Sequence, residues 1–363
     1  MKLIGIFILF CFILFGCNNK KSKKNKIQKN NLIDFAQNFK LSKKGEKTFI
    51  YILNPETKST EMTFFLDKKT PNFIWINNKK NSTSSIIVFS STFIGLLDKL
   101  NELNRIKGVD NLKIIHNKII KEGINAGKIK ELGSSESSNI EEILNTKSEL
   151  ILYSGFGNKF PYDEKLKKFN ISSLPIYDWK ETHPLGKAEW IKVIGAITNK
   201  ENEANLYFDK LKKRYLSIQE KYKNIKLSKP LFSGSLIGDY WYFPAGESYL
   251  SNLFKDARID YVEKSSKGIG SISKSFEYCL KKYQNTYYWL NPGNSSKTNL
   301  LTQNKNYRFF KAFKKNTFCY SHNPNLFWEK SAIEPDLLLL DLIQISHPEI
   351  NLNRNLYFYK NIK

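Results

Sequence analysis

The stretch NEANLYFDKLKKRYLSIQEKYKNI (residues 202–225) contains neither proline nor glycine, and apolar or aromatic side chains recur in it every three or four residues. This spacing predicts one amphipathic helix of about 25 residues, roughly 37 Å long at ~1.5 Å per residue. Pro230 prevents the helix from continuing much further. We assign residues 198–226 to a helix that links two folded lobes. The side chains that carry this prediction are Ala204, Tyr207, Leu211, Tyr215, Ile218, Tyr222 and Ile225.

Strand and helix patterns alternate on both sides of this helix. On the N-terminal side, KTFIYIL, MTFFL and NFIWI predict antiparallel strands, and a strand at 86–89 passes into a helix. A helix and then a strand at 150–153 follow. On the C-terminal side, a strand at 231–233, a helix at 248–257 and the helix–strand run FEYCLKKYQNTYYWL repeat the pattern. We therefore predict an α/β fold of two small parallel α/β lobes, at 46–197 and 227–363, joined by one long helix with a ligand cleft between them.

The N-terminus has the pattern of a secretory signal. Its apolar core, from Leu3 to Phe15, is shorter than the ~20 residues that a membrane-spanning helix needs. Leu14-Phe15-Gly16-Cys17 resembles the lipobox of bacterial lipoproteins, which implies a signal peptide at 1–16 and lipidation of Cys17. An ordinary signal peptide cleaved nearby is the alternative. We expect an exported protein that is lipid-anchored to a membrane and faces the periplasm.

The segment that follows Cys17 is strongly basic. Residues 18–31 contain six lysines and no acidic residue, so we predict a lipidated flexible tether at 17–45 whose lysines could contact anionic head groups. The whole chain has a formal net charge of +24, but its lysines are scattered among Asn and Ile, and no nucleic-acid partner is expected. After loss of Cys11 and lipidation of Cys17, Cys279 and Cys319 allow at most one disulfide.

Five segments, in order, resemble a known family. They are NIEEILNTKSELIL (139–152), THPLGKAEWIKVIGAITNKENEANLYFDKLKKRY (182–215), GDYWYFPAGESYLSNLFKDARIDYV (238–262), SISKSFEYCL (271–280) and IEPDLLLLDLIQISHPE (333–349). Across roughly residues 48–350 the chain resembles ABC-transporter substrate-binding lipoproteins of the helix-linked iron-siderophore and cobalamin type, the class III periplasmic binding proteins, in the form common in Bacteroidetes. The resemblance implies a non-enzymatic protein without a cofactor that captures a siderophore, haem or cobalamin and delivers it to an ABC permease.

The chain departs from the family pattern in two places. It has Asp256-Ala257-Arg258 where the family usually reads Asp-Ala-Gly, and Lys147-Ser148-Glu149 where the family often reads Lys-Pro-Asp. Neither position is expected in the cleft.

Two glutamates match acidic family residues that contact permease arginines. Glu141 and Glu277 stand at equivalent helix starts in the two lobes, and the resemblance implies that both dock on the permease. Acidic groups at an interface rim steer a partner more than they add affinity. The alternative for Glu141 is a capping box with Ser138.

Ligands of parallel α/β sheets gather where strands end. The loops predicted there are 90–92, 155–156, 177–179, 234–235, 241–242, 291 and 323–328. Aromatic side chains in these loops would offer flat faces to a planar or catecholate ligand, and basic ones would attract an anionic chelate. The predicted ligand-binding residues are Ser91, Thr92, Phe156, Trp179, Trp241, Tyr242, Asn291 and Trp328.

Two other functions are considered. Of the histidines His116, His183, His322 and His347, none are spaced as metal ligands, so a binding protein for free metal ions is only an alternative and no metal site is assigned. His183 and His322 lie in predicted loops that could supply an axial ligand to haem or cobalt. The other alternative is an exported two-lobed hydrolase, although the sequence lacks G-x-S-x-G, H-E-x-x-H and P-loop motifs.

Overall fold

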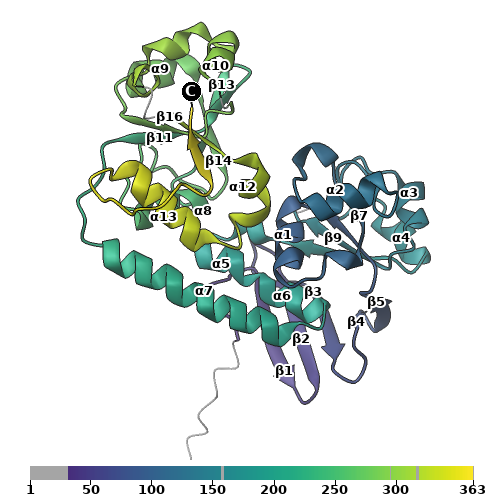
Figure 1. The fold of residues 1–363 in the computed structure, drawn as a ribbon. Coiled ribbons are helices and arrows are strands. Elements are labelled where there is room, and N and C mark those ends of the chain that lie inside the picture. The colour runs from purple at the N-terminus through teal and green to yellow at the C-terminus, as the bar shows by residue number, and fades with distance from the viewer. Residues whose placement is uncertain (1–31, 157–158, 295, 316–318, 363) are drawn as a thin grey trace, which may run out of the picture. The chain divides into compact units, whose positions relative to one another are not determined.

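Five antiparallel strands open the folded chain in the computed structural model, which describes residues 32–156, 159–294, 296–315 and 319–362. They are β1 (Phe39–Lys44), β2 (Lys47–Leu53), β3 (Thr60–Asp67), β4 (Phe73–Ile76) and β5 (Lys79–Ser82), and they pair in sequence order. In Figure 1 they extend below α6 and α7. The predicted strands in KTFIYIL, MTFFL and NFIWI are confirmed. The predicted signal peptide and Cys17 lie outside the described residues.

The tether prediction is wrong for residues 39–44, because they form β1 and pair with β2. The residues just before β1 are held by two buried carboxylates from far along the chain. Glu189 accepts hydrogen bonds from the backbone N–H groups of residues 34, 35 and 36, each 2.8 Å long. Glu181 accepts those of residues 37 and 38, and also that of the Trp190 indole. A polar segment that gains so many partners is ordered despite its composition.

The N-terminal lobe contains a fully parallel sheet in the order β10-β9-β6-β7-β8. The strands predicted at 86–89 and 150–153 are confirmed as β6 and β9, and the helix predicted after the first of them is α1. The strands are β6 (Ile86–Phe89), β7 (Ile106–Val109), β8 (Lys130–Glu131), β9 (Leu150–Ser154) and β10 (Ser172–Ile176). The helices of this region are α1 (Ser91–Lys99), α2 (Lys118–Asn125), α3 (Ile140–Asn145), α4 (Asp163–Lys168), α5 (Pro184–Glu189) and α6 (Ile191–Ile197), with short 3-10 turns at Leu103–Arg105, Leu112–Ile114 and Asp178–Lys180.

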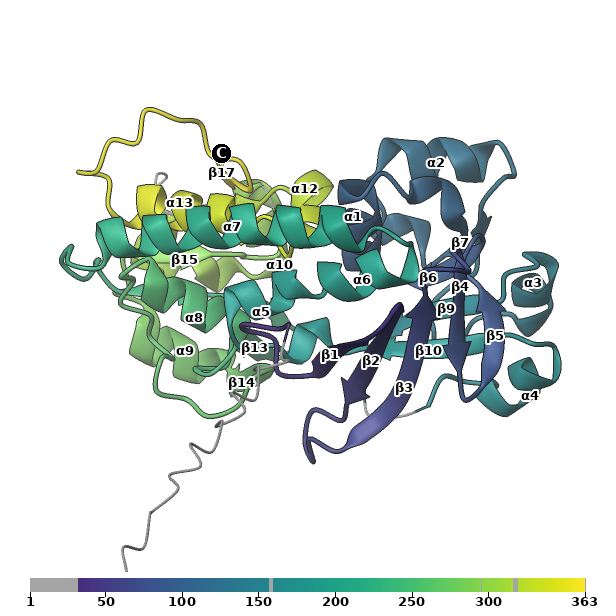
Figure 2. The ribbon, with the colours of Figure 1, turned by 90° about the horizontal axis from the view of Figure 1, so that it is seen from below.

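The long linking helix is present as α7 (Glu201–Tyr222). It ends slightly before the predicted boundary and is 22 residues long, which corresponds to ~33 Å. Ala204, Leu211, Tyr215 and Tyr222 are buried as the spacing predicted. Phe208 is also buried, so the apolar face is wider than expected. Helix α7 packs along α6 and along α13 (Pro335–Ser346), and therefore touches elements that precede and follow it (Figures 1 and 2).

The C-terminal lobe has a four-stranded sheet in the order β11-β15-β16-β17, in which β17 alone is antiparallel to its neighbour. A separate antiparallel sheet joins β12, β13 and β14. The strands are β11 (Leu231–Ser233), β12 (Ser235–Ile237), β13 (Tyr240–Pro244), β14 (Ser271–Ser275), β15 (Tyr288–Leu290), β16 (Cys319–His322) and β17 (Tyr359–Asn361). The remaining helices are α8 (Tyr249–Asp256), α9 (Phe276–Tyr283), α10 (Lys297–Gln303), α11 (Lys311–Lys314) and α12 (Pro324–Lys330), with a 3-10 turn at Lys305–Phe309.

Two α/β lobes joined by one long helix are therefore the architecture of this chain. Four elements predicted in the C-terminal lobe, β11, α8, α9 and β15, are confirmed. The loop expected at Trp241 and Tyr242 is instead the middle of β13, because both neighbouring strands supply hydrogen-bonding partners that sequence periodicity does not reveal. One hydrophobic cluster runs from Ile33 through α7 to Tyr359, so the lobes share a continuous core.

Candidate ligand-binding site

The N-terminal wall of the candidate site begins where β6 ends. Ser90 is extended (φ −174°, ψ 136°), and its hydroxyl accepts the Thr92 N–H at 3.2 Å, which caps α1. Ser91, which is buried, lies in the first turn of the same helix. The hydroxyl of Ser91 therefore lies at the start of α1, whereas the hydroxyl of Ser90 is already occupied as the cap of that helix.

An aromatic pair follows the ends of β9 and β10. The rings of Phe156 and Trp179 lie 5.0 Å apart, and the Trp179 indole donates to the carbonyl of Gly155 at 2.8 Å. Lys180 covers the Trp179 ring, with Nζ 4.6 Å from its centroid. Phe156 is 60% exposed, and a hollow of about 120 Å³ opens beside it. This pair is the best-formed aromatic surface among the predicted residues of this lobe.

The C-terminal wall is built around the ends of β11, β15 and β16. Asn291 has a left-handed backbone (φ +57°), and its amide donates to the Ser233 hydroxyl at 3.3 Å. Tyr242 is 40% exposed on β13. Trp328, on α12, is 49% exposed and meets the His322 ring edge-on at 5.4 Å. The pKa of His322 is lowered, chiefly by burial and then by Lys360, so the neutral imidazole is favoured.

The two walls meet at α1 and α12. The Ser91 hydroxyl reaches the Trp328 carbonyl at 3.5 Å, which joins two predicted ligand residues from opposite lobes. Gly95 allows this approach, since a Cβ there would lie 1.7 Å from the backbone oxygen of Glu329. The buried Glu329 carboxylate accepts the N–H groups of His116 and Asn117 at 2.6 and 2.8 Å. This junction was not predicted, because a lone glutamate at a helix end carries no signal for so distant a partner.

Two predicted placements need correction. Trp241 is fully buried, and its indole donates to the Ser233 carbonyl at 3.1 Å, so it offers no face to a ligand in this structure. His183 does not face a cleft, because its Nδ1 accepts the Leu185 N–H at 3.0 Å and its ring stacks on Phe35. The sequence left the pairing of Cys279 open, and in this structure Cys279 is a free, buried thiol.

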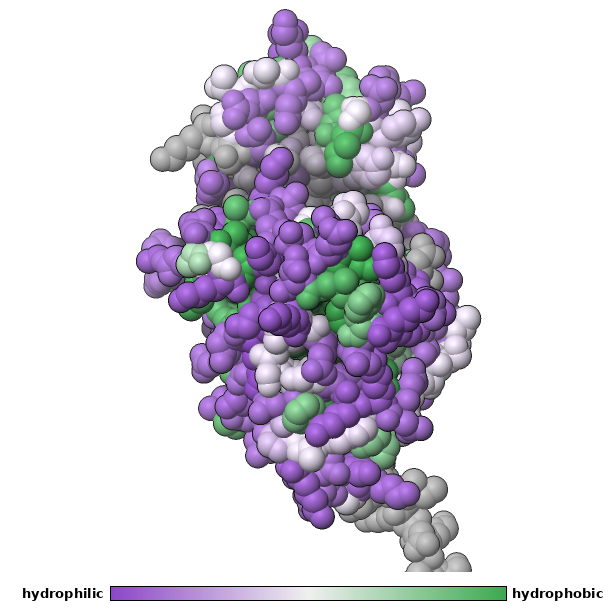
Figure 3. All heavy atoms as spheres, turned by 90° about the vertical axis from the view of Figure 1, so that its right-hand side faces the viewer, coloured by the Kyte–Doolittle hydropathy of each residue, from purple (hydrophilic) through white to green (hydrophobic). Residues whose placement is uncertain are grey.

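The two predicted docking glutamates are exposed in the first turns of α3 and α9. The cap of α3 is Asn139, whose side chain accepts the Glu141 N–H at 2.9 Å, so the expected cap at Ser138 is wrong. Ser275 caps α9, and its hydroxyl accepts the Tyr278 N–H at 3.2 Å. The side of the molecule that carries α3 and α4 is largely hydrophilic, with separated apolar patches (Figure 3).

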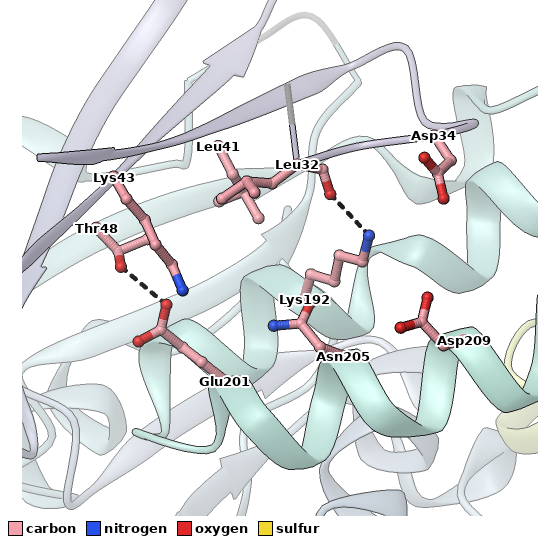
Figure 4. Close-up of a pocket in the computed structure, with 9 residues that line it drawn as sticks. All are labelled: Leu32, Asp34, Leu41, Lys43, Thr48, Lys192, Glu201, Asn205 and Asp209. Carbon is pink, nitrogen blue, oxygen red and sulfur yellow. Dashed lines mark hydrogen bonds between the residues drawn. The ribbon is translucent and has the colours of Figure 1, made fainter. Parts of the chain in front are cut away.

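A further hollow of about 250 Å³ lies away from the strand ends, between the β1–β2 hairpin and α7 (Figure 4). Charged and polar side chains line it, and two of them are already paired: Thr48 donates to Glu201 at 2.8 Å, and Lys192 donates to the Leu32 carbonyl at 2.8 Å. Because some of its polar groups are already paired and the hollow lies away from the strand ends, we do not place the ligand there.

Within the described residues, no cluster of three or more His, Cys, Asp or Glu side chains could hold a metal ion. In the same part of the chain no helix has the length and apolarity to cross a bilayer. Two parallel α/β lobes that meet across their strand ends define the class of two-lobed solute-binding proteins. The chain matches the model of the periplasmic binding protein family over residues 86–323, and it belongs to that family.

Relatives and solved structures agree with this assignment. An uncharacterized lipoprotein of Methanocaldococcus jannaschii is 29% identical over 286 residues, which cover 76% of this chain and 67% of the relative. A second one from the same organism is 25% identical over 334 residues, covering 88% and 84%. Because these relatives are archaeal, the Bacteroidetes-like subtype stays a prediction.

Two solved structures share the fold. A periplasmic heme binding protein from Pseudomonas aeruginosa has a TM-score of 0.58 at 11% identity, covering 74% of this chain and 94% of its own. A Helicobacter pylori protein crystallised as a nickel–histidine complex has a TM-score of 0.57 at 20% identity, covering 75% and 86%. At these identities the likeness shows the fold alone.

Proposed function

We propose that this protein is the substrate-binding component of an ABC importer and carries a metal chelate between its lobes. The observation that carries the proposal is the junction of Ser91 and Trp328, which brings the strand-end surfaces of the two lobes together. A ligand held there would touch both lobes, as capture between lobes requires. The heme and nickel–histidine ligands in the names of fold neighbours favour a chelate as the cargo.

The exposed side chains favour a flat, partly anionic ligand. Phe156, Tyr242 and Trp328 present aromatic faces, and Lys180 adds a positive charge over Trp179, the ring that packs on Phe156. His322, held neutral by burial, is the remaining candidate for an axial ligand to haem or cobalt. A siderophore, haem or cobalamin fits this combination. We retain Ser91, Thr92, Phe156, Trp179, Tyr242, Asn291 and Trp328 as the proposed ligand-binding residues.

Delivery would take place at a membrane. The curated relatives are named lipoproteins, which supports export and lipidation at Cys17. The exposed Glu141 and Glu277 are proposed to contact a permease, one from each lobe. The shared core and the α1–α12 contact restrict lobe movement to small closures. Recognition of the loaded protein therefore rests on these glutamates as well as on closure.

The test is a thermal-shift titration of the mature chain, made as Cys17→Ser, against ferric siderophores, haem, cobalamin and free metal ions. A ligand that binds only the folded state adds ~2.7 kcal/mol to the free energy of unfolding at a hundred times its Kd. We expect one chelate to raise Tm, and Trp328→Ala and Phe156→Ala to weaken its binding at least tenfold. Phe309→Ala is the matched control, because Phe309 is 43% exposed and lies outside the site.

The other outcomes separate the alternatives. A shift with free metal ions alone would favour metal-ion binding over chelate binding. Turnover of an ester or phosphate that disappears in Trp328→Ala would favour a hydrolase.

A further inference from the structure

The face of the β1–β5 sheet that points away from the core is a row of aromatic rings edged by lysines. Strand residues alternate, and Leu41, Ile50, Phe64 and Ile74 point into the main core. The opposite face carries partly buried aromatic residues together with lysines and small polar residues. The partly buried aromatic residues on this face are Phe49, Tyr51, Phe65, Phe73 and Trp75.

The strand register lines the rings up across the sheet. Phe49 pairs with Phe65, Phe65 with Trp75, and Trp75 with Lys80. The Phe49 and Phe65 centroids lie 5.4 Å apart, and the Phe65 and Trp75 rings stack at 5.2 Å with an interplanar angle of 5°. Cross-strand packing of this kind stabilises a sheet. It also produces a continuous aromatic surface on the side of the sheet that faces away from the main core.

Lysines lie directly on this aromatic row. Lys80 Nζ is 3.8 Å from the Phe73 centroid and 5.9 Å from the Trp75 centroid, and Lys47 Nζ is 4.8 Å from the Phe65 centroid. Each of these contacts places a positive charge next to an apolar ring. Side chains that combine apolar and charged groups in this way are favoured at a lipid–water interface.

One end of the sheet is strongly basic. The β1–β2 and β3–β4 turns are joined by a hydrogen bond from the Lys68 N–H to the Glu46 carbonyl at 3.2 Å. Five exposed lysines gather on these turns and the adjoining strand ends, against two acidic residues, Glu46 and Asp67. The lysines are Lys43, Lys44, Lys47, Lys68 and Lys69.

We propose that this aromatic and basic sheet face docks on the anionic membrane surface to which the protein is tethered. The proposal rests on the proposed lipid anchor at Cys17 for the identity of that membrane. Residues 18–31 separate Cys17 from the described chain, and fourteen residues reach at most ~48 Å when fully extended. Their six lysines favour the same leaflet, each by ~1 kcal/mol near an anionic surface. An anionic membrane surface accounts for the lysines of both the tether and the sheet face, and the tether keeps this face within reach of it.

The test is partitioning of the mature Cys17→Ser chain between buffer and vesicles. Vesicles of phosphatidylcholine with phosphatidylglycerol are compared with phosphatidylcholine alone, and the lipids carry brominated acyl chains that quench tryptophan. We expect binding to the anionic vesicles, with quenching that Trp75→Phe removes. Lys47→Glu with Lys80→Glu should lower the partition coefficient by at least about thirtyfold, because the loss of two lysines at ~1 kcal/mol each accounts for that much before the repulsion of the new carboxylates is added.

The matched control is Lys118→Glu with Lys267→Glu, which makes the same charge change at side chains that are 88% and 90% exposed elsewhere. Circular dichroism melts of all variants confirm folding. Equal loss of partitioning in the two double variants, or quenching that does not depend on Trp75, would overturn the proposal in favour of the tether lysines alone. Absence of binding to either vesicle would overturn it in favour of a protein partner. Mass spectrometry of Cys17 tests the anchor separately, because the vesicle assay uses unlipidated protein.

Discussion

Replacing Glu189 with Gln should be among the most destabilising polar substitutions in this protein. The Glu189 side chain is fully buried and accepts the N–H groups of Asp34, Phe35 and Ala36, together with the Lys192 ammonium at 2.7 Å. A glutamine can accept at only one of its two terminal atoms, so two of the four donors lose their acceptor and face an N–H₂ group. Hydrogen bonds to a charged group contribute ~1.5–3 kcal/mol each.

The expected loss is therefore about 3–5 kcal/mol of unfolding free energy, a large share of the ~5–15 kcal/mol typical of a protein. The assay is guanidinium unfolding followed by circular dichroism, with hydrogen exchange of residues 34–38 as a local readout. Glu220→Gln is the control, because Glu220 is 70% exposed and should change stability by less than about 0.5 kcal/mol. A loss below about 1 kcal/mol for Glu189→Gln, with unchanged exchange at 34–38, would refute the view that this carboxylate fixes the start of the fold.

Three further outcomes follow from individual contacts. Burial raises the pKa of Glu181 from 4.5 to about 7, although its hydrogen bonds act in the opposite direction. The folded state therefore binds a proton more tightly than the unfolded state. Stability, measured as Tm against pH, should fall as the pH rises from about 4.5 through 7. Gly95→Ala places a methyl group against the α12 backbone and should cost at least ~2 kcal/mol, whereas Gly270→Ala meets no atom within 4 Å and should be nearly neutral. Glu141→Lys with Glu277→Lys should abolish uptake by cells while ligand affinity in solution stays within about twofold.

A specific result would contradict each of these three predictions. A Tm that rises across that pH interval would contradict the raised pKa, and equal stability of the two alanine variants would contradict the close approach of α1 and α12. The control for uptake is Glu164→Lys with Glu220→Lys, because these side chains are 76% and 70% exposed at other helices. Uptake lost equally in both double variants would show that net charge, and not the proposed docking positions, matters.

The sequence by itself determined the features that depend on local periodicity. Helix α7 buries one face, and strands β6 and β9 bury nearly all of their residues. The order of apolar residues within each segment was therefore enough to predict them. It also indicated the two-lobed class, because strand and helix patterns recur on both sides of α7. The replacement of the family's usual glycine by Arg258 also has a local explanation. Arg258 adopts a left-handed backbone, with φ at +57°, a conformation that glycine adopts most easily.

Tertiary structure decided what depends on partners distant in sequence. Residues 34–38 look like part of a tether, and only the carboxylates of Glu181 and Glu189, more than 140 positions away, order them. Trp241 looks like a loop aromatic, yet two neighbouring strands enclose it. The junction of Gly95 with the Glu329 backbone has no sequence signature at all, because a close approach is set by where two helices meet rather than by either helix. The periodic burial of residues depends on a single segment and can be read from its sequence. Hydrogen bonding and close packing depend on two segments that are distant in sequence and come together only when the chain folds.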